Sequence, residues 1–299
     1  MLGSDPSWQC VLIAWGDRYP VGDINRLVRS IRSEARGLQR VILLSDRPRE
    51  GLEPGVEVRD IPAWYMAPAF RGGGCHTKLC LFEPGVVPDD LLAIYVDLDT
   101  LVFGDLSCVL DVMRTPSTVG LLPASILPFG AVSRGLRRLT GGRTAARGNS
   151  SVVVFHPGSV GFIAARFRQL VAAGTDLHKG PMRADDRFIS WVAEDRVRTV
   201  SNRHVVKFPA EFMQTWRWLV HLRAALPWVR RRRAGLVAVT FPGVQFKGEE
   251  LAALPDGAEI TDRRGRRLFW TDRAVGGMRG LIAKHYADAS GAPDTQVDP

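Results

Sequence analysis

Short apolar runs of strand length alternate with amphipathic stretches through the first half of this chain, and few folds accommodate that pattern. Cys10–Trp15, Arg40–Leu44 and Ala93–Val96 are near-continuous apolar segments, and Val56–Ile61 alternates. Between the first two runs, apolar residues recur at helical spacing, at Ile24, Leu27, Val28 and Ile31. Strands that read as buried on both faces and are separated by helices indicate a mostly parallel sheet flanked by helices, an α/β fold.

The second half is less regular. Its pattern predicts strands at Ser150–Phe155 and Leu236–Thr240, and helices at Val160–Ala172 and Asp185–Ala193. We find neither an internal repeat nor a clean linker, so residues 1–289 are expected to form one domain. The composition of residues 290–299 is typical of a disordered tail.

Composition narrows the class of protein but not its partner. The chain has 299 residues, 45% hydrophobic and 24% charged, which excludes a disordered chain, a collagen-like repeat and a coiled coil. The net charge is +9, and only five of the 40 basic residues are lysine. An arginine bias of this kind reflects either a GC-rich genome or attraction to an anionic partner, such as a nucleotide, an acidic glycan, a membrane face or nucleic acid.

The cysteines and the hydropathy of the chain indicate in which cellular compartment the protein works. The four cysteines are too few and too scattered for a disulfide scaffold. We see no signal peptide, and no apolar stretch approaches the roughly 18 residues of a membrane span. These features favour a cytoplasmic protein with reduced thiols.

The segment Tyr95–Thr100 places two carboxylates, Asp97 and Asp99, at the end of an apolar strand. Residues i and i+2 of an extended backbone point to the same face. Two buried carboxylates repel each other and are costly to desolvate, and a divalent cation relieves both costs. Oxygen ligands suit Mg²⁺ or Mn²⁺, which commonly bridge carboxylates to substrate phosphates. The alternative is a loop in which both side chains simply face water.

This segment resembles the DxD motif of GT-A-fold nucleotide-sugar glycosyltransferases, and the wider pattern is similar to bacterial relatives of glycosyltransferase family 8. Supporting segments follow in the same order over residues 10–250: Ala14–Tyr19 with Asn25–Leu27, Thr77–Phe82, Gly148–Val152 and Ala184–Ser190. The resemblance implies a GT-A-like (Rossmann-like) sheet, with a nucleotide-binding half near 8–115, an acceptor-side half near 116–250 and an extension over 251–289. It also implies a metal-dependent hexosyl transfer with retention at the anomeric centre.

The same resemblance assigns roles to individual positions. It places the nucleotide base and ribose against Trp15, Gly16, Asp17 and Tyr19, and the diphosphate near Lys78. Asp97 and Asp99 would hold Mn²⁺ or Mg²⁺, with Asp97 also reaching the donor. Asn149 and Ser150 would meet sugar hydroxyls, and Asp185 or Asp186 would support the reacting anomeric carbon. Each has a plainer alternative: Trp15 as core, Tyr19 as a capping aromatic, Lys78 as a solvated lysine, Asn149 and Ser150 as turn caps, and the paired Asp residues as a helix cap.

One departure concerns the third metal ligand. The family supplies a histidine from a late motif, and Pro242 stands at the similar position of this chain. Lys247, offset by one residue, could keep a phosphate-binding role. Two cysteines and a histidine around position 76 make a poor zinc pattern.

Tryptophan and arginine gather in residues 212–233, a composition suited to a membrane interface, an anionic glycan or stacked rings. A partly buried aromatic cluster with a solvated run of arginines is the plainer alternative. The basic residues match no nucleic-acid-binding module. We therefore expect a glycosyltransferase that uses a nucleoside diphosphate sugar, with a UDP-sugar favoured, and a glycan or lipid-linked acceptor in bacterial surface glycan synthesis. The competing interpretations are a non-catalytic glycan- or membrane-binding protein with a decayed site, and a nucleotidyltransferase-like enzyme.

Overall fold

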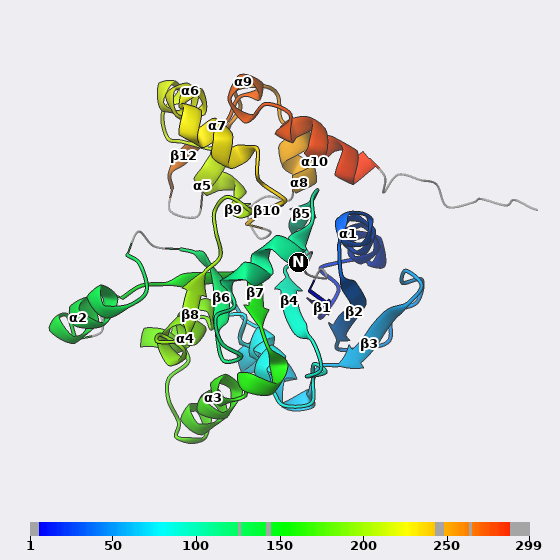
Figure 1. Ribbon diagram of the computed structural model, residues 1–299, viewed down its shortest axis with the longest axis vertical. Helices are drawn as coiled ribbons and strands as arrows, with labels where there is room; N and C mark the ends of the chain where they lie inside the picture. Colours follow the sequence, from blue (N-terminus) through cyan, green and yellow to red (C-terminus); the bar gives the residue numbers. More distant parts are fainter. Residues whose placement is uncertain (1–5, 125–126, 142–144, 243–247, 263–264, 288–299) are drawn as a thin grey trace, which may run out of the picture.

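The computed structural model describes residues 6–124, 127–141, 145–242, 248–262 and 265–287, and a seven-stranded sheet organises them (Figure 1). The strand order is β3-β2-β1-β4-β7-β6-β8. The first four of these strands run parallel, β7 is antiparallel to both of its neighbours, and β8 is parallel to β6. The strands are β1 Trp8–Ala14, β2 Leu38–Ser45, β3 Val56–Asp60, β4 Leu92–Val96, β6 Val119–Pro123, β7 Gly148–Phe155 and β8 Val197–Thr199.

Both faces of the sheet are buried, as the continuous apolar runs predict. Along β1, Val11 and Ile13 pack into one hydrophobic cluster, and Cys10, Leu12 and Ala14 pack into another on the opposite face. The first cluster is completed by α3 (Phe162–Ala172), α4 (Asp185–Val192) and the 3₁₀ helix η3 (His76–Phe82). The second is completed by α1 (Val21–Glu34) and η4 (Leu106–Val112). The fold class predicted from the sequence is confirmed.

A second, three-stranded sheet of order β5-β10-β9 links the main sheet to the C-terminal part of the chain. It comprises β5 (Thr100–Val102), β9 (Val205–Lys207) and β10 (Ala238–Thr240). Beyond it lie α5 to α10 and the hairpin β11–β12 (Figure 1). A third cluster, built around Phe208, Phe212, Phe241 and Trp270, fills this part. The elements of the C-terminal part are α5 Phe208–Phe212, α6 Arg217–Ala225, α7 Pro227–Arg233, α8 Gly248–Ala253, β11 Glu259–Thr261, β12 Arg267–Phe269, α9 Asp272–Val275 and α10 Met278–Ala287.

The structure differs from the sequence prediction at several elements. The segment Thr77–Phe82, one of those that carry the family resemblance, lies in a 3₁₀ helix, and strand β6 was not predicted. The three-residue strands β5, β8 and β9 were not predicted, because their apolar runs are too short to show a period. Residues 290–299, predicted to be a disordered tail, lie outside the described residues.

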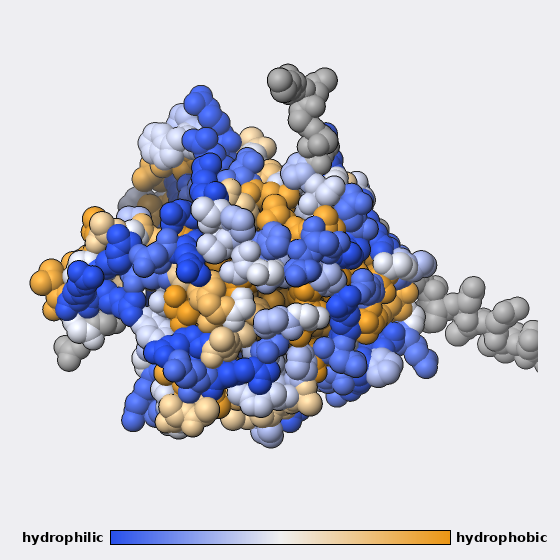
Figure 2. Space-filling view, turned by 60° about the horizontal axis from the view of Figure 1, so that its bottom comes forward, coloured by the Kyte–Doolittle hydropathy of each residue, from blue (hydrophilic) through white to orange (hydrophobic). Residues whose placement is uncertain are grey.

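The helix α2 (Ala131–Leu139) stands away from the sheet (Figure 1), and apolar side chains gather at its end of the surface in Figure 2. Val132 and Leu139 are exposed, whereas the Ser133 hydroxyl faces inward and accepts a hydrogen bond from the Ala146 amide. In the described part of the chain, no helix combines the length and apolarity needed to cross a bilayer.

Candidate functional site

The antiparallel pairing of β7 with β4 brings two distant segments together at the edge where β1, β2 and β4 end. Val96 pairs with Val152, and the Asp97 amide donates a hydrogen bond to the Ser151 carbonyl over 2.8 Å. The start of β7, with Asn149 and Ser150, therefore lies beside the end of β4, with Asp97 and Asp99. Ligands of open α/β sheets bind at this kind of edge.

Lys78 lies at the centre of this site and is almost fully buried. Its amine is 2.8 Å from Asp97 Oδ1 and 3.6 Å from Asp185 Oδ2. The Ser150 hydroxyl donates to Asp185 over 2.6 Å, and the Tyr95 hydroxyl donates to Asp97. Burial alone lowers the pKa of Lys78, but the charges of Asp97 and Asp185 outweigh it, so the pKa lies well above its usual value. Lys78 is therefore a permanent cation that fixes two carboxylates.

The segment before η3 holds α4 in position. The Asp185 amide donates to the Gly74 carbonyl over 2.9 Å, which ties the first turn of α4 to this segment. A Cβ on Gly74 would lie 2.9 Å from the Arg183 carbonyl oxygen and 2.4 Å from the His76 ring, so the backbones meet too closely for a side chain. Cys75 follows with a φ of 52°, a rare left-handed conformation for a residue with a Cβ.

Asp186 and Lys207 face the same site from two further elements. Burial, and then the charge of Asp185, raise the pKa of Asp186, while Lys207 opposes the rise. Burial lowers the pKa of Lys207, partly offset by Asp97, Asp186 and Asp99. Among the described residues, no ion pair or hydrogen bond holds the Lys207 amine. It is thus a poorly solvated cation near three carboxylates, available to an anionic ligand.

The small sheet explains how Lys207 reaches this site. Thr240 of β10 pairs with Lys207 of β9 on one side and with Thr100 of β5 on the other. Two strand spacings of about 4.8 Å separate Lys207 from the residue that follows Asp99. Lys207 was not among the site residues predicted from the sequence. Its segment, Val205–Lys207, nevertheless shows the same pattern as Tyr95–Asp97, an apolar run that ends in a charged residue.

The loop after β1 is shaped by residues that follow β2. The Gly16 amide donates to Asp46 over 2.9 Å, and the buried Arg49 side chain donates to the carbonyls of Gly16 and Tyr19. Trp15 packs half-buried against the core, and the Asp17 carboxylate is 89% exposed and paired with Arg47. Burial and the charge of Asp99 raise the pKa of Tyr19, so the Tyr19 ring lies near Asp99.

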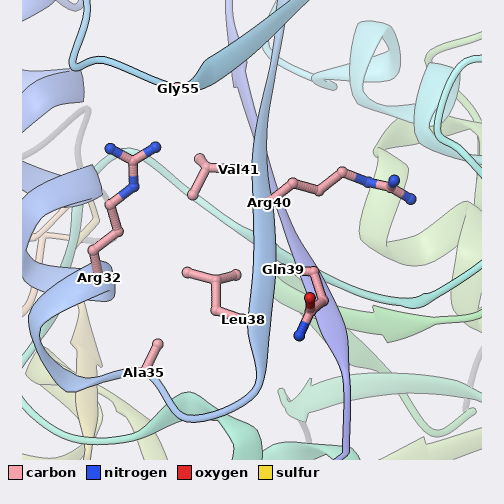
Figure 3. A pocket seen from close by; sticks show the side chains of 7 residues that line it. All are labelled: Arg32, Ala35, Leu38, Gln39, Arg40, Val41 and Gly55. Carbon is pink, nitrogen blue, oxygen red and sulfur yellow. The ribbon is translucent and has the colours of Figure 1, made fainter.

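A cavity of about 830 Å³ opens next to Asp186, between the main sheet and the C-terminal part; its described lining does not include Lys78, Asp97, Asp99 or Asp185. Asn149, Asp186, Lys207 and Pro242 all line it. A separate cavity of about 180 Å³ lies between α1 and β2 (Figure 3). There Arg32 donates to the Pro54 carbonyl, while Arg40 extends from the other side of β2 and donates to Gln9 and Asp90. The larger cavity is therefore the better candidate for a substrate site.

The chain was compared with protein families, with curated sequences and with solved structures, and only the solved structures resemble it. No family model matches the chain, and no curated protein sequence does. Solved structures do match. The galactosyltransferase LgtC, crystallised with donor and acceptor sugar analogues, is 14% identical with a TM-score of 0.55, covering 96% of this chain and 98% of its own. An active-site mutant of LgtC is 13% identical to this chain with a TM-score of 0.56, and the coverage of both chains is the same. The chain has the GT-A fold of these glycosyltransferases.

A further match is the bifunctional glycosyltransferase WbbM, at 13% identity and a TM-score of 0.54. It covers 97% of this chain, and this chain spans half of WbbM. The resemblance in fold, inferred from the motifs, is thus confirmed.

The structure brings most of the predicted site residues together. Lys78, Asp97, Ser150 and Asp185 are in direct contact, and Asp99, Asp186 and Tyr19 lie near them. Asp17 points toward solvent and Arg47. Asn149 Oδ1 accepts a hydrogen bond from the Ser151 amide and also borders the cavity. Lys247 lies outside the described residues. The assigned roles of all these residues stay predictions.

The fit of a metal ion can be judged from charge. Four carboxylates, Asp97, Asp99, Asp185 and Asp186, share this site with two amines, Lys78 and Lys207. The Arg18 guanidinium also acts on this site, so four carboxylates face three cations and the formal excess is one negative charge, which favours a bound cation. Within the described residues, no group of three His, Cys, Asp or Glu side chains could hold a metal. The site therefore fits an ion that takes one or two carboxylates and completes its shell with phosphates and water.

Proposed function

We propose that this protein is a glycosyltransferase that moves a sugar from a nucleoside diphosphate sugar, with a UDP-sugar favoured, to a glycan hydroxyl in bacterial surface glycan synthesis. The observation that carries the proposal is the Lys78–Asp97–Asp185 cluster, whose neighbour Asp186 lines a cavity at the ligand-binding edge of a GT-A fold. LgtC, of the same fold, was crystallised with donor and acceptor sugar analogues. The resemblance in motifs further implies retention at the anomeric centre.

Asp97 and Asp99 would hold Mn²⁺ or Mg²⁺ in this proposal. Bound there, the ion would supply positive charge to the diphosphate of the donor. Lys78 orients Asp97 through their ion pair, and the Lys207 amine, which has no hydrogen bond or ion pair among the described residues, offers a second cation to the diphosphate. These charges act in a partly water-excluded site, where they are worth more than in bulk solvent.

Asp185 and Asp186 take different roles because they face different ways. Asp185 is held inward by Ser150 and Lys78, so it orients the site. Asp186 borders the cavity, and burial raises its pKa. We assign Asp186 to support the positive charge that develops at the anomeric carbon. The bond from that carbon to the diphosphate breaks with its electron pair on the diphosphate. The acceptor oxygen bonds to the same face of the carbon, and its proton passes to an oxygen of the departing diphosphate.

A thermal-shift screen with UDP and GDP, each with and without Mn²⁺, tests this proposal. We expect stabilisation by a nucleoside diphosphate that requires the metal, followed by turnover of one member of a nucleotide-sugar panel, detected by mass spectrometry. NMR of the product's anomeric proton reports retention. Stabilisation by glycans alone would favour the non-catalytic alternative, and turnover of a nucleoside triphosphate with a sugar phosphate would favour the nucleotidyltransferase alternative.

We also propose that the α6–α7 region touches the inner face of the cell membrane. Trp216, Trp218 and Trp228 are 58%, 62% and 65% exposed, and the Trp216 and Trp218 rings stack. Two exposed arginines, Arg230 and Arg231, follow in α7. Exposed tryptophans beside arginines suit the boundary between lipid headgroups and acyl chains.

The expected result is sedimentation of the protein with vesicles that contain an anionic lipid and not with neutral vesicles. A Trp216→Ser, Trp218→Ser, Trp228→Ser variant should lose most of this binding while its Tm stays within about 2 °C, because the three rings are exposed. Leu139→Ser, which removes an exposed apolar side chain at the end of α2, is the control. Equal sedimentation of all three proteins would contradict the proposal.

A further inference from the structure

A buried carboxylate in the cavity wall is in contact with more positive charge than it can neutralise. Glu211 of α5 is 4% exposed. Three guanidinium groups contact it: Arg223 at 3.1 Å, Arg232 at 2.5 Å and Arg233 at 2.8 Å. One carboxylate against three permanent cations leaves a formal excess of two positive charges.

This excess is unfavourable without an anion. Burial lowers the pKa of Arg223; Glu211 opposes that effect, and the neighbouring Arg232 and Arg233 add to it. The Nε atom of Arg232 is buried and lacks a hydrogen-bond partner within the described residues. A group of like charges with an unsatisfied donor is stabilised when an anionic ligand binds beside it.

The cluster faces the cavity of the proposed active site. Arg223 and Arg232 line that cavity together with Asp186 and Lys207. Lys207 is the N-cap residue of α5, and Glu211 lies within this short helix. The described residues that line the cavity include six basic and three acidic side chains. The lining of the cavity therefore carries an excess of positive charge.

We propose that the acceptor is an acidic glycan, whose carboxylate or phosphate is bound by Arg223 and Arg232 while its reacting hydroxyl lies near Asp186. The inference rests on the proposed transferase function and adds the chemical class of the acceptor. Guanidinium groups bind carboxylate and phosphate alike, through two parallel hydrogen bonds. Gln214 and Thr215, which also line the cavity, offer amide and hydroxyl groups to the neutral part of the glycan.

Calorimetric titration with three matched probes tests this proposal: a neutral disaccharide, the same disaccharide with a terminal uronic acid, and the same disaccharide with a terminal phosphate. We expect at least one acidic probe to bind about tenfold or more tightly than the neutral one, with a preference that weakens as salt is raised. The stronger of the two acidic probes identifies the anionic group. Equal affinities for all three would overturn the proposal.

The chain offers a matched control. Arg233 contacts the same Glu211 but lines a neighbouring cavity instead. Arg223→Gln and Arg232→Gln should each remove most of the preference for the acidic probe, and Arg223→Lys, which keeps the charge and loses the planar fork, should remove part of it. Arg233→Gln should keep the preference. Equal loss in the Arg233 variant would show that the arginines only stabilise Glu211, and would also overturn the proposal.

Donor binding separates failure of this inference from failure of the proposed function. Each protein is also tested for the metal-dependent shift by UDP or GDP. A normal donor shift without acidic preference refutes the acceptor class alone. Acidic preference without any donor binding or turnover refutes the transferase function and leaves an acidic-glycan-binding site.

Discussion

Asp99→Asn is expected to slow donor turnover about 10³-fold while leaving the fold intact. The substitution keeps the size of the side chain and removes one of the two negative charges that would hold the metal. Loss of a preorganised charge at a diphosphate costs several kcal/mol of transition-state stabilisation, and each 1.36 kcal/mol is a factor of ten in rate. The Asp99 backbone carbonyl, which accepts from the Phe241 amide over 3.0 Å, is unaffected.

Three measurements check this prediction: kcat for donor hydrolysis, the metal-dependent thermal shift, and Tm without ligand. We expect the first two to be lost and the third to be unchanged. Asp60→Asn, an exposed aspartate at the end of β3, is the control and should behave like the wild type. Asp97→Asn should lose both activity and stability, because Asp97 also pairs with Lys78. Turnover near the wild-type rate in Asp99→Asn would contradict the role assigned to Asp99.

The sequence predicted the parts of the molecule whose signals are local. Apolar runs located β1, β2, β4 and β7 within about two residues, and the carboxylates after β4 marked the ligand-binding edge. Burial of these strands on both faces leaves a continuous hydrophobic signal that needs no tertiary information.

Lys207 and Glu211 were missed because their importance depends on distant partners. β9 is three residues long and gains its place only by pairing with β10, more than 30 residues later in the chain. Residues 230–233 read as a solvated basic run, whereas Arg232 and Arg233 turn inward onto Glu211. Lys78 shows the converse: the sequence located it correctly in the site, but only the fold shows that it pairs with two carboxylates. Such pairings join segments up to about a hundred residues apart, which no local pattern encodes.

Lys78→Met is expected to lower stability more than any other single change at this site, by about 3 kcal/mol, because it leaves Asp97 and Asp185 buried without their cation. Thermal denaturation should show a fall in Tm of about 5–10 °C, with Lys284→Met, an exposed lysine of α10, unchanged.

The pH dependence of this loss distinguishes a charge effect from a packing effect. The folded pKa of Lys78 is raised, so its contribution is complete below the unfolded pKa of about 10.4 and is lost only as the pH rises through the folded value. In Lys78→Met the two carboxylates lack their cation, and this cost falls away in acid as protonation removes their charge. The difference in Tm should therefore be largest near neutral pH and shrink toward pH 4. A pH-independent difference would mean that Lys78 acts through packing of its aliphatic stem, and the carboxylates would then have to be held by Ser150 and Tyr95 alone.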